Sequence, residues 1–255
     1  LSAKTSFLEQ SSKIFYPYIN DGLGLPFNYT DLYGKISLNS PGGSRLNIFG
    51  FNCSDNVSYQ GLSNLGWDSY GIGANFIVVP NGSTVMIKAN MSYSDYKIGL
   101  QSLDNYPSSS GINGFNLGLD FLYFLGKNQF VWGLETRGFN TDFEYYNSVG
   151  RLLKQEENTT QLATYFKYKL NLGNLLIEPG VRLQYYASMG DVSLEPRLGI
   201  KYNITEMLRF KLAAGLYSQD LVAANSDKDV VNLFYGFLSG NLSSLPDEFK
   251  NEDLT

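Results

Sequence analysis

Apolar and polar residues alternate with a period of two over long stretches of the sequence, and this pattern limits the possible folds most strongly. Successive side chains of a β-strand point to opposite faces, so the pattern indicates strands with one apolar and one polar face. Six segments show it clearly: 70–78, 85–93, 115–123, 175–185, 194–202 and 208–216. Their apolar faces comprise 31 positions without a charged residue, whereas a chain that is 17% charged would place about five there by chance.

The connections between these segments alternate as well. Four weaker segments, 28–38, 45–52, 130–139 and 159–170, bring the expected total to ten strands. Short turns rich in Gly, Pro and Asn are predicted at 39–44, 80–83, 126–129, 171–174 and 203–207. Long polar loops are predicted at 53–64, 95–112, 140–158 and after Tyr217, with 187–191 as a short exception. The turns and the long loops should therefore lie at opposite ends of the sheet.

These features together are typical of an all-β fold, the wall of an antiparallel transmembrane β-barrel. Strands of ten to twelve residues, tilted by about 40°, span roughly 25 to 30 Å, which matches the apolar band of an outer membrane. Backbone groups in lipid must pair within the protein, so spanning strands must close into a ring. Tyrosines near the ends of the apolar faces fit an aromatic girdle: Tyr70, Tyr93, Tyr123, Tyr185 and Tyr202.

Composition excludes several classes of function. The chain has no His, one Cys and a net charge of -5 without a basic run, which argues against metal and redox chemistry and against nucleic-acid binding. The sequence has no run of 18 or more predominantly apolar residues that would form a transmembrane helix. The acidic pairs Asp142 with Glu144 and Glu156 with Glu157 are interpreted as solvated loop charges rather than a catalytic pair. We therefore expect neither an enzyme nor a bound cofactor or metal.

Four stretches resemble TonB-dependent outer-membrane receptors of Bacteroidota. They are LPFNYTDLYGKISL (25–38), LEPRLGIKYNIT (194–205), LRFKLAAGLYSQ (208–219) and DVVNLFYGFLSG (229–240). The resemblance covers the whole chain, is specific for the middle of the barrel and carries no substrate motif.

The resemblance implies a barrel of about 22 strands in the outer membrane of a Gram-negative bacterium, occluded by an N-terminal plug. It also implies a receptor whose outer loops bind a scarce solute and whose plug, driven by the TonB complex, admits it to the periplasm. The sequence shows no plug, no TonB-contacting segment and no terminal strand ending in an aromatic residue. We therefore expect these residues to be an internal fragment of a longer polypeptide.

Charged residues on the polar face of neighbouring strands form one candidate site. We expect them to form a cross-strand charge ladder whose members satisfy one another or dock the plug. Alternatively, they line a solute path, as charged rings do in selective pores. The residues are Glu178, Arg182, Glu195 and Arg197.

Aromatic residues in and beside the predicted loops form a second candidate site. Aromatic rings with amide and hydroxyl neighbours suit siderophores, glycans or peptides, which combine flat apolar faces with hydrogen-bonding rims. Packing of these rings on one another is the alternative. The residues are Tyr59, Trp67, Tyr96, Tyr106, Tyr145 and Tyr146.

A helix is predicted at about 227–239, with a capping-box start and one apolar stripe. Its stripe includes Phe234 and Phe237. The helix either covers the barrel mouth or docks a surface lipoprotein. A second short helix is predicted at 11–19.

Two alternatives to a TonB-dependent receptor stay open on the sequence alone. One is a small outer-membrane barrel of ten strands that acts as a pore, an adhesin or a structural subunit of a membrane complex. The other is a soluble β-rich sugar-binding protein. The uncharged face of 31 positions is the feature that bears on the soluble alternative, and detergent dependence of solubility is the check.

Overall fold

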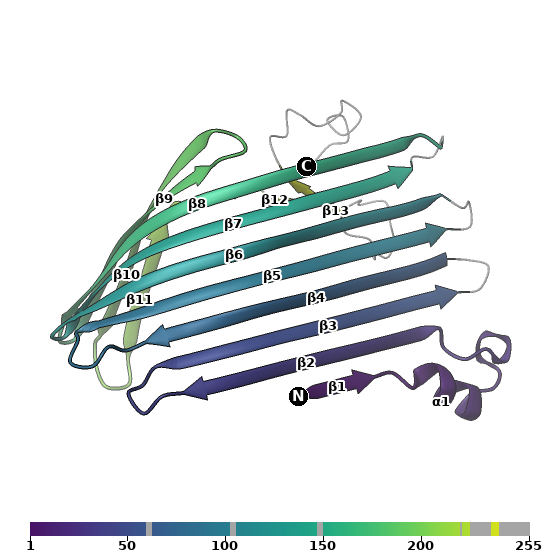
Figure 1. Ribbon diagram of the computed structural model, residues 1–255, viewed down its shortest axis with the longest axis horizontal. Coiled ribbons are helices and arrows are strands. Elements are labelled where there is room, and N and C mark those ends of the chain that lie inside the picture. Colours follow the sequence, from purple (N-terminus) through teal and green to yellow (C-terminus); the bar gives the residue numbers. More distant parts are fainter. Residues whose placement is uncertain (60–62, 103–105, 147–149, 220, 225–235, 240–255) are drawn as a thin grey trace.

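Eleven antiparallel strands form one continuous sheet in the computed structural model (Figure 1). The structure describes residues 1–59, 63–102, 106–146, 150–219, 221–224 and 236–239. Strands pair strictly in chain order, from β1 to β11. Their bounds are β1 Ser2–Thr5, β2 Phe27–Asn39, β3 Arg45–Tyr59, β4 Ser63–Val78, β5 Val85–Ser102, β6 Pro107–Leu125, β7 Asn128–Tyr146, β8 Leu152–Leu172, β9 Leu175–Tyr186, β10 Asp191–Asn203 and β11 Arg209–Gly215.

The ten strands expected from the sequence are confirmed as β2 to β11, in the expected order. The short strand β1 adds to the edge beside β2. Within the described residues, β1 and β11 are the two edges of an open sheet. The antiparallel wall is thus present, and it does not close on itself in these parts of the chain.

The predicted short turns are also confirmed, and they lie together at one end of the sheet (Figure 1). Two of them are two-residue hairpins that begin with Gly126 and Gly173, at φ +63° and +75°. A positive φ at the first turn position matches the right-handed twist of the flanking strands and strongly favours glycine there. These glycines therefore set the register of the pairs β6–β7 and β8–β9.

The predicted long loops at 53–64, 95–112 and 140–158 are wrong over most of their length. Strands β3 to β8 run for 15 to 21 residues, and β7 and β8 stay paired as far as Tyr146 and Leu152. At this end the apolar side chains of one face give way to charged ones, as shown by the 2.6 Å ion pair between Lys154 Nζ and Glu144 Oε1 on that face. Backbone pairing needs no apolar side chain, so the strands continue where the alternation has ended.

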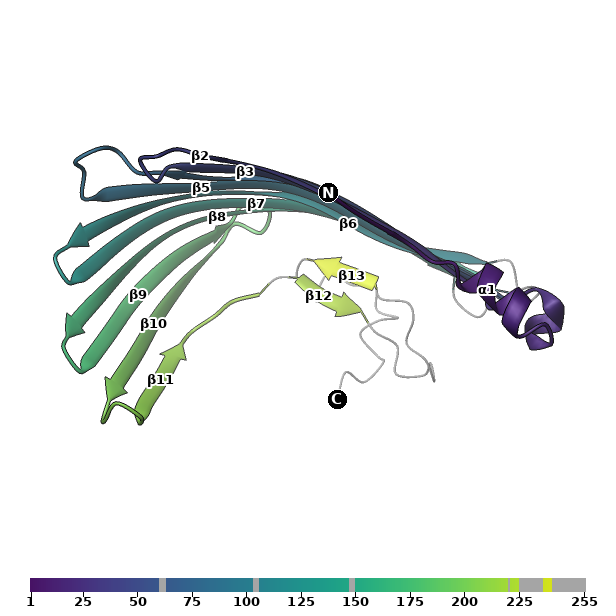
Figure 2. The same cartoon turned by 90° about the horizontal axis from the view of Figure 1, so that it is seen from below.

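The sheet is strongly curved (Figure 2). Its two faces differ in their side chains. Apolar side chains on the convex face are exposed, including Ile72 at 61% and Leu117 at 46%. Several polar side chains on the concave face are buried, including Glu195 at 2% and Gln161 at 6% exposure. This distribution is the reverse of that in a water-soluble domain, where large apolar patches are rarely exposed.

Stacked aromatic rings cross the convex face of the central strands. Trp132 lies between Phe121 and Phe166, with ring centroids 5.2 and 6.5 Å away. Its Nε1 donates a 3.1 Å hydrogen bond to Thr164 Oγ1, so the indole has a partner on an otherwise apolar surface. Of the five predicted girdle tyrosines, Tyr70 and Tyr93 lie tilted against each other at 6.2 Å.

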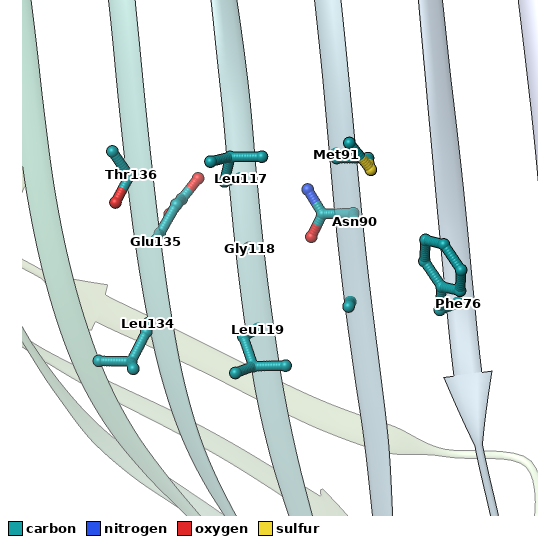
Figure 3. Close-up of a pocket in the computed structure, with 10 residues that line it drawn as sticks. Phe76, Asn90, Met91, Leu117, Gly118, Leu119, Leu134, Glu135 and Thr136 are labelled. Carbon is teal, nitrogen blue, oxygen red and sulfur yellow. The ribbon is translucent and has the colours of Figure 1, made fainter.

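A shallow hollow of about 320 Å³ interrupts the same face where small residues replace large ones (Figure 3). Ala89 lies between Phe76 and Leu119 in the lateral row of paired residues, and Thr136 lies beside Leu117. The lining residues are Phe76, Ala89, Asn90, Met91, Leu117, Gly118, Leu119, Leu134, Glu135 and Thr136.

An N-terminal helical segment precedes β2 at the end of the sheet away from the short turns (Figure 1). It comprises α1 (Leu8–Phe15) and a 3₁₀ turn (Ile19–Gly22), so the helix predicted at 11–19 is confirmed in part. Hydrogen bonds from Lys13 and Asn28 hold the pKa of Glu9 below its usual value. None of the helices in the described parts of the chain is long and apolar enough to cross a membrane.

A short hairpin, β12 (Leu221–Ala224) with β13 (Gly236–Ser239), follows β11 and lies on the concave side of the sheet (Figure 2). Strand β13 packs against β6, β7 and β8. The helix predicted at 227–239 is wrong at its end, because 236–239 form β13. Residues 227–235 lie outside the described residues. The pairing of β13 with β12 supplies the backbone hydrogen bonds that a helix would otherwise provide.

Candidate functional site

A chain of hydrogen-bonded polar side chains crosses the centre of the concave face. Asn90 on β5 donates from Nδ2 to Asn116 Oδ1 on β6 at 2.7 Å. Asn116 donates in turn to Glu135 Oε1 on β7 at 3.1 Å. Arg182 on β9 approaches from the other side, and its Nη1 lies 2.6 Å from Glu135 Oε2. Both oxygens of Glu135 are therefore engaged by residues from other strands.

The chain of hydrogen bonds continues beyond Arg182. Its Nε donates to Gln184 Oε1 at 2.9 Å, and Gln184 Nε2 donates to Gln161 Oε1 on β8 at 3.1 Å. The side chains of Arg182 and Glu135 are only 12% and 14% exposed. A charge pair this far removed from water is favourable only when further hydrogen bonds satisfy its remaining polar atoms. The surrounding amides meet that condition.

Tyr165 on β8 adds an aromatic element to this network. Its ring covers Gly133 on β7 so closely that a Cβ at that glycine would overlap it. The hydroxyl donates to Asp120 on β6, and the Arg182 guanidinium lies 5.8 Å from the ring centroid. The absence of a side chain at Gly133 thus places a tyrosine between a carboxylate and a guanidinium.

Of the four residues in the expected charge ladder, only Glu195 and Arg197 bind each other, and they belong to the same strand. Glu195 and Arg182 are register partners on β10 and β9, but Arg182 binds Glu135. Glu195 binds Arg197 of its own strand at 2.6 Å. Glu178 lies 3.5 Å from Lys167 on β8. All four predicted residues share the concave face. Glu178 binds a diagonal neighbour on the adjacent strand, which long side chains can reach, and Arg182 reaches across β8 to Glu135 two strands away.

Three of the predicted aromatic residues lie on the concave face: Trp67 on β4, Tyr96 on β5 and Tyr145 on β7. Trp67 pairs laterally with Ile98, which is 2% exposed and continues the row to Ser110 and Phe143. The end of the concave face opposite the short turns therefore carries a partly covered patch of aromatic, aliphatic and hydroxyl groups.

Of the remaining predicted aromatic residues, Tyr106 and Tyr146 lie apart from this patch. Tyr146 belongs to the opposite face of β7 and stacks on Tyr106 at 5.3 Å. Tyr59 ends β3, and only its backbone is described. Phe237 lies in β13 with only its backbone described, and Phe234 lies outside the described residues. The six aromatic residues are therefore not brought together into one site.

Several members of the network were missed by the sequence analysis: Glu135, Gln161, Tyr165 and Gln184. The sequence does indicate their face, because each lies at an alternate position of its strand that points to the polar face. Glu135, Gln161 and Tyr165 lie on β7 and β8, where the alternation is weak and marks the polar face poorly. Within the described residues, no group of three Asp, Glu, Cys or His side chains could hold a metal ion.

Comparison with known proteins identifies the fold. No protein-family model and no curated protein matches the sequence. Among solved structures, the chain is similar to the iron transporter FrpB of Neisseria meningitidis, with 12% identity, TM-score 0.61 and coverage of 83% of this chain and 39% of that one.

Two further structures agree. The alcaligin outer-membrane receptor FauA of Bordetella pertussis gives 12% identity and TM-score 0.59, covering 71% of this chain and 34% of that one. The siderophore receptor PirA of Pseudomonas aeruginosa gives 13% identity and TM-score 0.56, covering 80% of this chain and 34% of that one. The chain thus shares the fold of part of the antiparallel wall of these outer-membrane β-barrels. It spans between a third and two-fifths of the length of these structures.

Proposed function

We propose that this chain is part of the barrel wall of a TonB-dependent receptor in a Gram-negative outer membrane, which imports a small solute. The observation that carries the proposal is the reversed distribution of polarity on a sheet similar to those of outer-membrane receptors. An apolar convex face suits contact with lipid, and a buried polar concave face suits a filled lumen. We propose that the complete barrel has about 22 strands and is of the Bacteroidota type.

The solute is proposed to be a siderophore, a glycan or a peptide. The similar structures include receptors named for siderophores and an iron transporter, which favours the first of these. Trp67, Tyr96 and Tyr145 on the concave face offer rings beside hydroxyl groups, a combination that suits such ligands. We propose no catalytic role and no resident cofactor for the chain.

The partners are proposed to be outer-membrane lipid at the convex face and a plug domain, coupled to the TonB complex, at the concave face. Arg137 and Arg197, with side chains 51% and 42% exposed, are held by Glu135 and Glu195 and retain donors that can reach a plug. A surface lipoprotein is proposed as a further partner.

The two alternatives to a receptor, a soluble sugar-binding protein and a small closed barrel, are less favoured. A soluble sugar-binding protein would not expose large side chains such as Ile72 and Leu117 across one continuous face. A closed ten-stranded barrel would require β2 and β11 to pair, whereas β2 pairs with β1 and β3.

The test uses the full-length protein in its own membrane. Cells with and without the gene are fractionated, and uptake of radiolabelled iron chelates, oligosaccharides and peptides is measured with and without a protonophore. We expect the protein in the outer membrane and gene-dependent uptake of one class that the protonophore abolishes. Uptake that ignores the protonophore would instead indicate a passive pore. Recovery of the protein without detergent would favour a soluble protein.

A further inference from the structure

The wall strand β11 ends early, and the chain then turns into the concave side of the sheet. Strand β11 has 7 residues, whereas its partner β10 has 13. After Gly215 the backbone makes one more bond to the wall, from Leu216 N to Pro196 O at 3.0 Å. It then leads to the hairpin β12–β13, which lies within the curve of the sheet (Figure 2). A specific interaction is needed to hold the chain in this direction, since β10 still offers an edge along which β11 could have continued.

Ser218 supplies that interaction through Glu195. One carboxylate oxygen, Glu195 Oε1, accepts hydrogen bonds from Ser218 N at 3.1 Å and from Ser218 Oγ at 2.6 Å. The Tyr186 hydroxyl on β9 lies 2.7 Å from the same Oγ. Ser218 is thus fixed through both its backbone and its side chain to two strands of the wall.

Arg197 completes the arrangement on the other side of the carboxylate. Its Nη2 donates to Glu195 Oε2 at 2.6 Å, and its guanidinium lies 4.6 Å from the ring centroid of Tyr217. Gly215 leaves room for this stacking, because a Cβ there would lie 3.1 Å from the Tyr217 ring and 3.2 Å from Arg197. Consecutive residues after β11 are therefore held by one buried carboxylate and the arginine bound to it.

Glu195 is free for this role because Arg182, its register partner, is bound to Glu135. The Glu195 side chain is 3% exposed, and a buried carboxylate needs hydrogen-bond donors to remain ionised there. Arg197 and Ser218 provide those donors. The carboxylate and the turned chain thus stabilise each other.

We propose that Tyr186, Glu195 and Arg197 form a clasp that holds Tyr217 and Ser218 against the wall and directs the chain into the lumen. The clasp thereby fixes hairpin β12–β13 across the concave face, where β13 packs against β6, β7 and β8. The hairpin is a built-in narrowing of the lumen rather than a surface loop. This consequence rests on the proposed function: a solute that crosses this part of the lumen passes beside the hairpin.

The test measures where β12 lies in the full-length protein. Spin labels are placed at Ala223→Cys on β12 and at Asn75→Cys, an exposed concave position on β4, after Cys53→Ser removes the thiol of this segment and any other native thiols are replaced. Pulsed electron paramagnetic resonance gives the distance distribution between the labels. The clasp variants are Ser218→Ala with Tyr186→Phe, and separately Glu195→Ala. Ser193→Ala is the matched control, on the same face and strand two residues from Glu195.

We expect a narrow distribution in the parent and in Ser193→Ala, and a broader one with a longer mean distance in both clasp variants. Heat-modifiable migration on gels confirms that each variant forms its barrel. If Glu195→Ala does not assemble, the Ser218→Ala, Tyr186→Phe variant still decides, because it leaves the charge pair with Arg197 intact. An unchanged distribution in that variant, or equal broadening in Ser193→Ala, would overturn the clasp. No solute is used, so the result is independent of whether the transport proposal holds.

Discussion

Arg182 and Glu195 face each other as register partners on β9 and β10, yet each binds another residue. Arg182 reaches Glu135 two strands away, at 2.6 Å. Glu195 binds Arg197 and Ser218. Because Arg182 and Glu195 do not bind each other, two carboxylates have different roles on the concave face. Glu135 links the wall strands through Arg182, and Glu195 holds Ser218 where the chain leaves the wall.

Removal of Arg182 should destabilise the barrel strongly. Arg182→Met leaves Glu135 buried with fewer donors, and breaking a buried pair costs about 3 to 5 kcal/mol. Urea titration of folding into lipid vesicles measures this difference. Lys167→Met is the control, because Lys167 is 47% exposed and 3.5 Å from Glu178, and such a pair contributes under about 1 kcal/mol. Equal losses for the two variants would contradict the network described above.

A charge on the convex face should be costly, whereas one on the concave face should not. We expect Leu117→Arg to lower the free energy of unfolding in vesicles by about 2 to 4 kcal/mol if its side chain meets lipid near the midplane. Ser92→Arg lies on the neighbouring strand with its side chain exposed on the concave face. A cost for Ser92→Arg as large as that for Leu117→Arg would show that the convex face does not contact lipid.

Gly133 should tolerate no side chain. Gly133→Ala forces the Tyr165 ring away and with it the hydrogen bond to Asp120, and overpacking of this kind costs about 1 to 3 kcal/mol. Gly199→Ala is the matched control, since its new Cβ would meet Glu178 at an ordinary 3.8 Å. The free energy of unfolding in vesicles is measured for both variants. We expect the value for Gly199→Ala to be close to that of the parent.

The two tryptophans should differ in their effect on solute binding. Trp67→Ala on the concave face should weaken binding about 2- to 10-fold, the range expected from loss of one aromatic contact. Trp132→Ala on the convex face should leave the dissociation constant unchanged, although it removes a stacked ring. Calorimetry with the solute identified by the uptake experiment measures both. Weakened binding only in Trp132→Ala would place the solute site elsewhere.

Much of the wall could be predicted from alternation alone. The ten strands, their order, the short turns and the uncharged face all followed from residues such as Ile72 and Leu117, because a pleated strand separates its side chains by parity. The same reasoning failed where the pattern fades. Alternation predicts a loop at Asp142, Glu144 and Lys154, whereas backbone pairing carries β7 and β8 through them.

The sequence by itself determined which residues share a face, because parity along a strand is local. It did not determine which of them touch. That Arg182 binds Glu135 rather than Glu195, that Tyr165 covers Gly133, and that Ser218 returns to Glu195 depend on curvature, diagonal reach and the path of the chain beyond β11. These are properties of strands brought together from distant parts of the chain, so only the tertiary structure decided them.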